Sequence, residues 1–303
     1  MTLKELCSIH GPSGSEWRIK KILLNYIQKN CSTWAVKPVV LSEGIKDNLI
    51  LVFGKPRTVI FCHYDTTGFT VRYNNRIIPI GSPAYDENTI LRSVTAEHSG
   101  KTYRIRKEEE QDYSLISKTI TEAGTTLSFD CKFIENKTRF TGPYIDNRAG
   151  VWVSLKLAET LRNGMIVFTA YEEHGGGSVE FLAPYIYNKY HIQQALICDM
   201  TWESECVKQG KGMVVSLRDK YIPRETYLRQ ITGILNKNNV LFQKEVEGSG
   251  ASDGGYLQKS AVPFDWCFCG AAVTGMHSSA ESVHLKDLES LQKALLILME
   301  NLK

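Results

Sequence analysis

No run of apolar residues in the sequence is long enough to span a bilayer, so we expect no membrane-spanning helix. The chain also lacks a strong charge of either sign, because 36 basic residues stand against 33 acidic ones, a net charge of +3. This balance gives no electrostatic basis for binding nucleic acid or an anionic membrane. Residues 1–10 lack the apolar core of a secretory signal and contain Lys4 and Glu5.

The 8 cysteines form no C-x-x-C pair. Several lie in apolar, strand-like runs, which favours reduced thiols in a core over disulfides. Cys267 and Cys269 alternate along one such run and could share a metal ion, but no second pair of ligands accompanies them. Together with the lack of a secretory signal, this predicts a cytoplasmic protein.

The order of expected elements indicates one domain inserted into another. Between residues 68 and 142, short segments alternate apolar with polar residues, turn residues separate them, and no helix is expected. After residue 142, strands such as 165–171 alternate with helices, which implies a sheet covered on both faces. We therefore predict an α/β domain from residues 1–67 and 143–303, with a small antiparallel β domain, residues 68–142, inserted.

Histidines and carboxylates gather at the ends of the predicted strands and at the start of one helix. Seven residues share this placement: His63, Asp65, Asp146, Glu172, Glu173, Asp199 and His277. Sites in α/β proteins collect where loops leave the strands. Imidazole and carboxylate groups without a thiolate predict a metal site with open positions rather than a closed structural one.

Each of these residues also has a simpler interpretation. His63 alone could be a core histidine, Asp146 a helix N-cap, and Asp199 the start of a turn. Glu172 and Glu173 are harder to explain in this way, because adjacent buried carboxylates are costly without a cation. The joint placement of all seven residues favours the metal site over these simpler interpretations.

Several motifs together resemble a known family. They are His63-Tyr-Asp65 with Gly68, Asp146-Asn-Arg-Ala-Gly150, Glu172-Glu173, Asp199, Ser252-Asp253 and His277-Ser-Ser-Ala-Glu281. In this order they resemble the tetrahedral-aminopeptidase family of di-metal exopeptidases, which includes glutamyl, leucyl and lysyl aminopeptidases and members labelled endoglucanase. The resemblance covers nearly the whole chain. It implies a three-layer zinc-exopeptidase domain with an inserted small antiparallel β-barrel.

The resemblance also implies a metal centre. Two divalent metal ions are expected, zinc first, with cobalt or manganese as alternatives. His63 and Asp199 would bind one ion, Glu173 and His277 would bind the other, and Asp146 would bridge them.

The remaining roles follow from the same resemblance. Asp65 would orient the His63 imidazole, and Glu172 would act as the general base that moves a proton from water to the leaving amine. The peptide bond between Asp146 and Asn147 would be cis. The implied activity is hydrolysis of the N-terminal residue from peptides with a free N-terminus, by a homo-oligomer.

Three features depart from the family pattern. Thr66 stands where family members commonly have glutamate, and the inserted region is shorter than usual, so the sequence does not predict the size of the assembly. The loop of residues 174–177 is unusually rich in glycine. None of these departures removes a predicted ligand.

Three other functions are alternatives to an aminopeptidase. A carboxypeptidase or an N-acyl amino acid amidohydrolase would share the metal core, but the 146–150 element favours the aminopeptidase. A polysaccharide hydrolase needs two carboxylates on either side of the scissile bond, and Glu172 and Glu173 are sequence neighbours. A catalytically silent relative would need to have lost a ligand or the base, and all of these are present.

Overall fold

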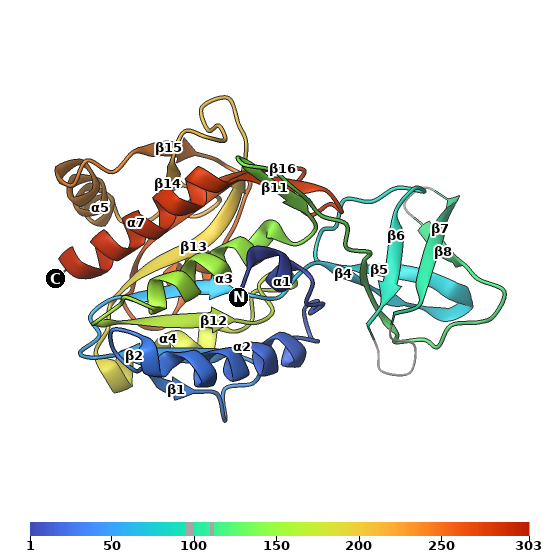
Figure 1. Ribbon diagram of the computed structural model, residues 1–303, viewed down its shortest axis with the longest axis horizontal. Helices are drawn as coiled ribbons and strands as arrows, with labels where there is room; N and C mark the ends of the chain where they lie inside the picture. The colour runs from blue at the N-terminus through green and yellow to red at the C-terminus, as the bar shows by residue number, and fades with distance from the viewer. Residues whose placement is uncertain (95–99, 110–111, 303) are drawn as a thin grey trace.

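A computed structural model of the protein describes residues 1–94, 100–109 and 112–302. The strands form two separate assemblies, a large sheet in the body of the molecule and a barrel beside it (Figure 1). Residues 95–99 and 110–111 of the predicted insert lie outside the described residues. Within the described ranges, no helix combines the length and the apolar character needed to cross a membrane.

The large sheet has parallel strands at its centre. Its order is β1 (Val39–Leu41), β2 (Leu49–Phe53), β12 (Gly164–Thr169), β3 (Val59–His63), β13 (Gln194–Trp202), β16 (Asp265–Thr274), β17 (Glu281–His284), β11 (Arg139–Gly142) and β10 (Ile134–Glu135). β14 (Met213–Arg218) pairs with β16 and with β15 (Phe242–Val246). β12, β3, β13 and β16 run parallel to one another. Because helices cover both faces of the sheet, these strands consist mainly of apolar residues.

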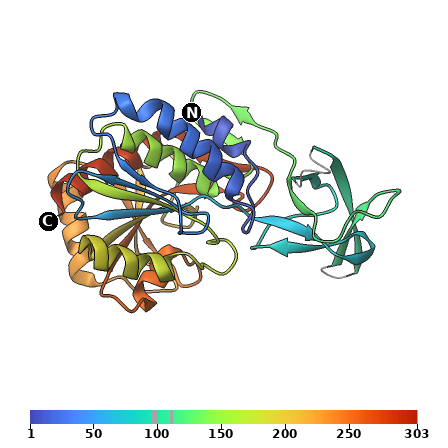
Figure 2. The ribbon, with the colours of Figure 1, turned by 90° about the horizontal axis from the view of Figure 1, so that it is seen from below.

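The two faces of the sheet carry alternate residues of each strand. On β3, Ile60 and Cys62 pack into one core, and Val59 and Phe61 pack into the other. The first core includes residues of α1 (Leu3–Cys7), α2 (Trp17–Asn30), α3 (Ile145–Ala158), α5 (Glu225–Lys237) and α7 (Leu285–Asn301). The second includes residues of α4 (Val179–Tyr190) and α6 (Asp253–Lys259). Figure 2 shows the sheet between these helical layers, which confirms the predicted three-layer α/β fold.

The barrel is closed by six antiparallel strands, in the order β4 (Gly68–Val71), β5 (Arg76–Ile80), β8 (Asp112–Ile116), β7 (Thr102–Glu109), β6 (Ile90–Ser93) and β9 (Thr126–Phe129). Phe69, Leu91, Ile105, Leu127 and Phe129 lie in its apolar core. Two short 3-10 helices, η1 (Cys31–Thr33) and η2 (Tyr73–Asn75), complete the described elements. This confirms the predicted antiparallel β-barrel.

The last part of the predicted insert joins the large sheet. β11 pairs with β17, and β10 pairs with β11, although the insert was predicted to extend to residue 142. The barrel strands themselves lie between Gly68 and Phe129. The division of the chain into domains at residues 68 and 142 stays a prediction.

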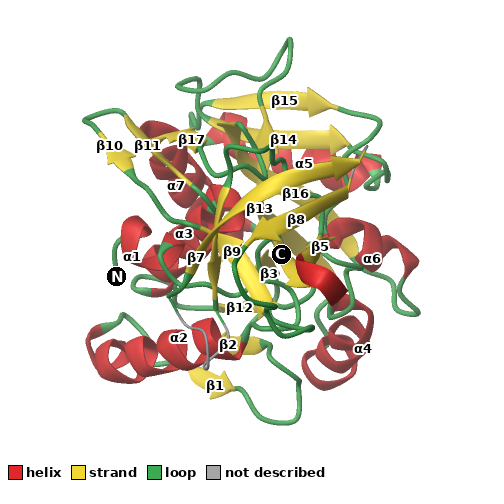
Figure 3. Cartoon of the chain, turned by 90° about the vertical axis from the view of Figure 1, so that its right-hand side faces the viewer, coloured by secondary structure: helices red, strands yellow, loops and turns green. Residues whose placement is uncertain are grey.

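The parallel strands bring their carboxyl ends to one edge of the sheet. His63 ends β3 and pairs in register with Thr169, which ends β12. β13 lies on the other side of β3 and carries Asp199. Figure 3 views the molecule from the barrel side, with helices around the strands of the large sheet.

Candidate metal centre and active site

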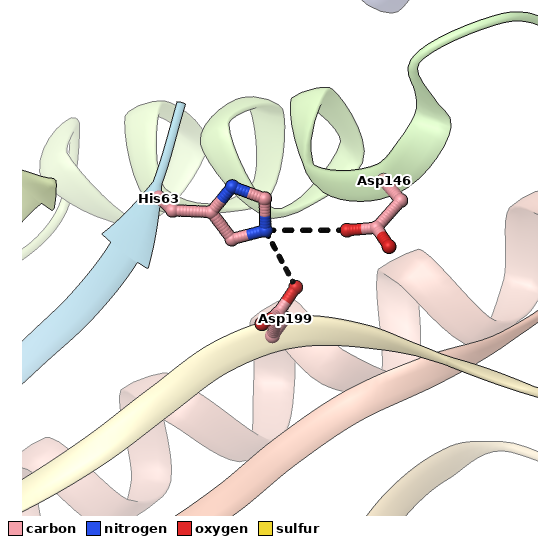
Figure 4. Close-up of side chains that lie close together, drawn as sticks. All are labelled: His63, Asp146 and Asp199. Carbon is pink, nitrogen blue, oxygen red and sulfur yellow. Dashed lines mark ion pairs between the residues drawn. The ribbon is translucent and has the colours of Figure 1, made fainter. Parts of the chain in front are cut away.

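The structure brings the predicted ligands together at this edge of the sheet. His63, Asp146 and Asp199 each offer one ligand atom, and these atoms all lie within 4.8 Å of one another. The His63 Nε2 atom lies 3.3 Å from Asp146 Oδ1 and 3.2 Å from Asp199 Oδ1 (Figure 4). The three side chains come from β3, the first turn of α3 and β13. Segments that are far apart in the sequence therefore meet around one point.

A second group shares Asp146 with the first. Asp146, Glu173 and His277 offer ligand atoms that again all lie within 4.8 Å of one another. The His277 Nε2 atom lies 3.3 Å from Asp146 Oδ2 and 3.3 Å from Glu173 Oε2. The two carboxylate oxygens of Asp146 therefore face different histidines. This is the arrangement expected of a carboxylate that bridges two cations.

Several carboxyl groups of the site are buried close together, and their raised pKa values indicate that positive charge is missing beside them. Burial raises the pKa of Glu173 well above its usual range, and the neighbouring Asp146 raises it further. Burial also raises the pKa of Asp199, to about 6. Among the described residues, the buried atoms His63 Nδ1, Asp146 Oδ1 and Glu173 Oε1 have no hydrogen-bond partner. Buried carboxylates in this number are costly without cations, and imidazole and carboxylate donors suit zinc, cobalt or manganese. The residues present fit a metal centre.

Asp65 makes contacts that the sequence did not predict. Its carboxylate accepts hydrogen bonds from the backbone N–H groups of Glu172 and Glu173, both at 3.1 Å, and from the Ser13 hydroxyl at 2.6 Å. The His63 Nδ1 atom lies 3.6 Å from Asp65 Oδ1, which is longer than a hydrogen bond. In this structure Asp65 therefore holds the segment that carries the two glutamates, and its predicted role in orienting His63 stays a prediction.

Glu172 lies beside the first ligand group and belongs to neither group among the described residues. Its side chain is 14% exposed, and its Oε2 atom lies 3.9 Å from His63 Nε2. Burial raises its pKa well above the usual range, and the anionic neighbours Asp199 and Asp253 raise it further, although His63 acts in the opposite direction. A carboxyl group whose pKa is raised binds a proton more readily than an exposed carboxyl group does.

Glu281 is a buried residue to which the sequence assigned no role. It is 1% exposed. Its Oε2 atom accepts a hydrogen bond from the Asp146 N–H at 2.9 Å, and its Oε1 atom accepts one from the His277 N–H at 2.7 Å. One carboxylate thus joins the two backbone segments that carry Asp146 and His277. The only signal in the sequence is its place four residues after His277.

The segment after Asp146 has the backbone that the resemblance implied. The peptide bond between Asp146 and Asn147 is cis. The Asn147 side chain donates to the Cys198 carbonyl oxygen at 2.8 Å and accepts from the Gly150 N–H at 3.1 Å. The first of these bonds fastens the start of α3 to β13 beside Asp199, and the second lies within α3.

The structure shows the surroundings of two of the departures from the family pattern. Thr66 is buried, its N–H donates to the Gly11 carbonyl oxygen, and its carbonyl oxygen accepts from the Ser13 N–H, so it holds Ser13 near Asp65. In the glycine-rich loop, Gly176 has a φ of 61°, and a Cβ atom there would lie 1.8 Å from the Tyr256 ring. Only glycine fits this position without a rearrangement.

A comparison with family models decides the assignment. The model of the M42 glutamyl aminopeptidase family matches residues 109–294, more than half of the chain. The chain belongs to this family. It is therefore a metal-dependent aminopeptidase, a hydrolase that acts on peptide bonds. Among curated proteins, none matches this M42 chain.

Solved structures support the fold of this M42 aminopeptidase. The TET1 peptidase of Pyrococcus horikoshii has a TM-score of 0.81 at 21% identity, with 98% of each chain covered. A TET aminopeptidase from the marine sediment archaeon Thaumarchaeota has a TM-score of 0.86 at 17% identity, with 99% of this chain and 95% of that chain covered. A Thermotoga maritima protein called endoglucanase has a TM-score of 0.73 at 16% identity, with 99% and 96% covered. At these identities the likeness shows the fold alone.

Proposed function

We propose that five residues hold two divalent metal ions, which are zinc in the native enzyme: His63, Asp146, Glu173, Asp199 and His277. The observation that carries this proposal is the pair of ligand groups that share Asp146, one carboxylate oxygen facing each histidine. A carboxylate between two imidazoles suits two cations better than one. When bound, such ions supply Lewis acidity to the scissile carbonyl and to a water molecule.

The residues of the chain do the remaining chemistry. Glu172 accepts the proton of the attacking water while the bond between that oxygen and the carbonyl carbon forms. It then donates the proton to the amine nitrogen as the C–N bond breaks. The Asp65 carboxylate accepts hydrogen bonds from the backbone N–H groups of Glu172 and Glu173. These bonds hold the proposed base and the proposed ligand Glu173 in place beside the other ligands. The attack takes place in a cavity of about 440 Å³ lined by both ligand groups.

The charges around this cavity favour an aminopeptidase over a carboxypeptidase. No lysine or arginine is among the residues that line it in the described part of the chain. A carboxypeptidase or an N-acyl amino acid hydrolase has to bind a free carboxylate, and a cationic side chain is the usual partner for that group. The free amine of a peptide N-terminus needs no cationic side chain for its binding.

Glu172→Gln tests the proposed mechanism. The substitution keeps the size of the side chain and leaves every proposed ligand in place, so we expect the metal content to stay at two ions per chain. Turnover should fall at least 100-fold, which is the usual contribution of a general base. The measurements are metal analysis by mass spectrometry and hydrolysis of aminoacyl p-nitroanilides with zinc, cobalt or manganese. Turnover within a few-fold of the unmutated enzyme would remove Glu172 from this role.

We also propose that the enzyme is a cytoplasmic homo-oligomer that acts on peptides with a free N-terminus. The 8 cysteines are all free in the structure, which supports a reducing compartment. The Pyrococcus horikoshii relative can assemble into a tetrahedron or a large octahedral shell, which supports self-association. Light scattering after size-exclusion chromatography tests this directly, and a monomer at micromolar concentration would contradict it.

A further inference from the structure

The cavity at the metal centre continues to a second set of carboxylates. Glu245 and Asp219 line it together with the proposed ligands. Glu245 is 4% exposed and Asp219 is 7% exposed. Neither residue belongs to a ligand group within the described residues. Glu245 accepts a hydrogen bond from the Thr201 hydroxyl and Asp219 accepts one from the Tyr221 N–H, but burial still raises the pKa of both carboxyl groups.

β13 sets the distance between the two sets of carboxylates. Asp199 and Thr201 are two residues apart on this strand, so they share a face and are separated by about 7 Å. The Thr201 hydroxyl donates a hydrogen bond to the Glu245 carboxylate. Glu245 thus lies one strand repeat beyond a proposed metal ligand. This is within the reach of one extended side chain whose backbone sits at the metal centre.

The same cavity also has apolar residues in its wall. Trp202, Ala251 and Phe268 line it, and Gly250 allows the Trp202 ring to approach the loop, because a Cβ atom there would lie 3.0 Å from the indole. A cavity that combines apolar residues with buried carboxylates matches a side chain with an aliphatic stem and a cationic end. Lysine and arginine have this form.

Burial raises the pKa of Asp219, and the positive charge of Arg218 acts in the opposite direction without forming an ion pair. Across the described residues, no ion pair includes Glu245 or Asp219. The nearby Arg218 donates to the backbone carbonyl oxygen of Asp219 rather than to its carboxylate. Burial raises the pKa of Glu245, while hydrogen bonds from Thr201 and Ser216 stabilise its anion. A bound ammonium or guanidinium group would supply the missing charge.

We infer that Glu245, with Asp219 beside it, selects peptides whose N-terminal residue is lysine or arginine. This inference rests on the proposed function, since it places the N-terminal residue of the substrate at the metal centre. An N-terminal glutamate would bring a like charge against Glu245 and is expected to be a poor substrate. The preference of this enzyme would then differ from the glutamyl specificity after which its family is described.

The test compares p-nitroanilides of lysine and norleucine, whose side chains share a four-carbon stem and differ in the charged end. With the metal-loaded enzyme, we expect the kcat/KM of lysine to exceed that of norleucine by about 10- to 100-fold, the range for a hydrogen bond to a charged group. Arginine should behave like lysine, and glutamate should be the poorest substrate. In Glu245→Gln, which keeps the size of the side chain, the lysine-to-norleucine ratio should fall at least 10-fold while norleucine changes less than 3-fold.

A surface variant serves as the matched control. Glu225 lies on α5 with 76% of its side chain exposed, and Glu225→Gln should leave the ratio unchanged. If the unmutated enzyme hydrolyses norleucine or leucine as fast as lysine, the inference is overturned while the proposed function stands. An unchanged ratio in Glu245→Gln, with metal content and melting temperature preserved, would also overturn it. If none of the p-nitroanilides is hydrolysed with any metal, the proposed function itself fails.

Discussion

Glu281→Gln perturbs the metal centre without touching a proposed ligand. The carboxylate accepts one hydrogen bond from the Asp146 N–H and one from the His277 N–H, and the side chain is 1% exposed. Glutamine keeps the shape but turns one acceptor oxygen into an NH2 group, so one of the two N–H groups would face a donor. A hydrogen bond to a charged group contributes about 1.5–3 kcal/mol, and leaving a buried partner unsatisfied adds a cost of similar size.

This change should weaken metal binding rather than the chemical step. Asp146 belongs to both ligand groups, so a shift of its backbone affects both ions. Mutation of a residue that orients a metal ligand typically lowers metal affinity by about 10- to 100-fold. The assay is competition with a chelator, followed by metal analysis, together with kcat measured at saturating metal. We expect weaker binding of both ions, with kcat largely recovered at saturation.

The control for this experiment is Glu289→Gln, on the exposed side of α7. It makes the same chemical change eight residues further along the chain and should alter neither metal affinity nor stability. If Glu281→Gln binds both ions within two-fold of the unmutated enzyme and melts at the same temperature, the reasoning from these two hydrogen bonds is wrong.

Two further predictions concern the shared ligand and a buried acid. Asp146→Ala should lose both ions together, and retention of two tightly bound ions in metal analysis would contradict the bridging role. Burial, and then the nearby Asp65, raises the pKa of Glu16 from 4.5 to about 7. The folded protein therefore keeps a proton that the unfolded chain releases, so this residue's contribution to stability falls as pH rises from about 4.5 to about 7. In urea titrations over this range, Glu16→Gln should lose stability less steeply than the unmutated protein, and equal slopes would refute the assignment.

Much of the site could be predicted from the sequence because its residues have local signatures. His63, Glu172 and Asp199 follow apolar segments of the sequence that are readily interpreted as strands, and parallel strands bring their carboxyl ends to one edge. In the structure only His63 ends its strand, since β12 ends at Thr169 and β13 continues past Asp199 to Trp202. The barrel was predictable for the same reason, because its short alternating strands are separated by turn residues.

The supporting contacts could not be predicted because they join segments that are distant in the sequence. Asp65 holds the backbone of Glu172 more than 100 residues away, and Glu281 reaches Asp146 across a similar separation. Glu245 lies on a strand with no distinctive pattern, and its importance depends on the hydroxyl of Thr201 in another strand. The pairing of β10 and β11 with the large sheet was missed because their short alternating sequences resemble those of the barrel.

The central claim is that one aspartate lies between two metal ions. Crystals grown with zinc and measured on both sides of the zinc absorption edge test it directly. The account predicts two anomalous peaks per chain, one among His63, Asp146 and Asp199 and the other among Asp146, Glu173 and His277. A single peak at full metal loading, or two peaks of which only one contacts Asp146, would contradict it.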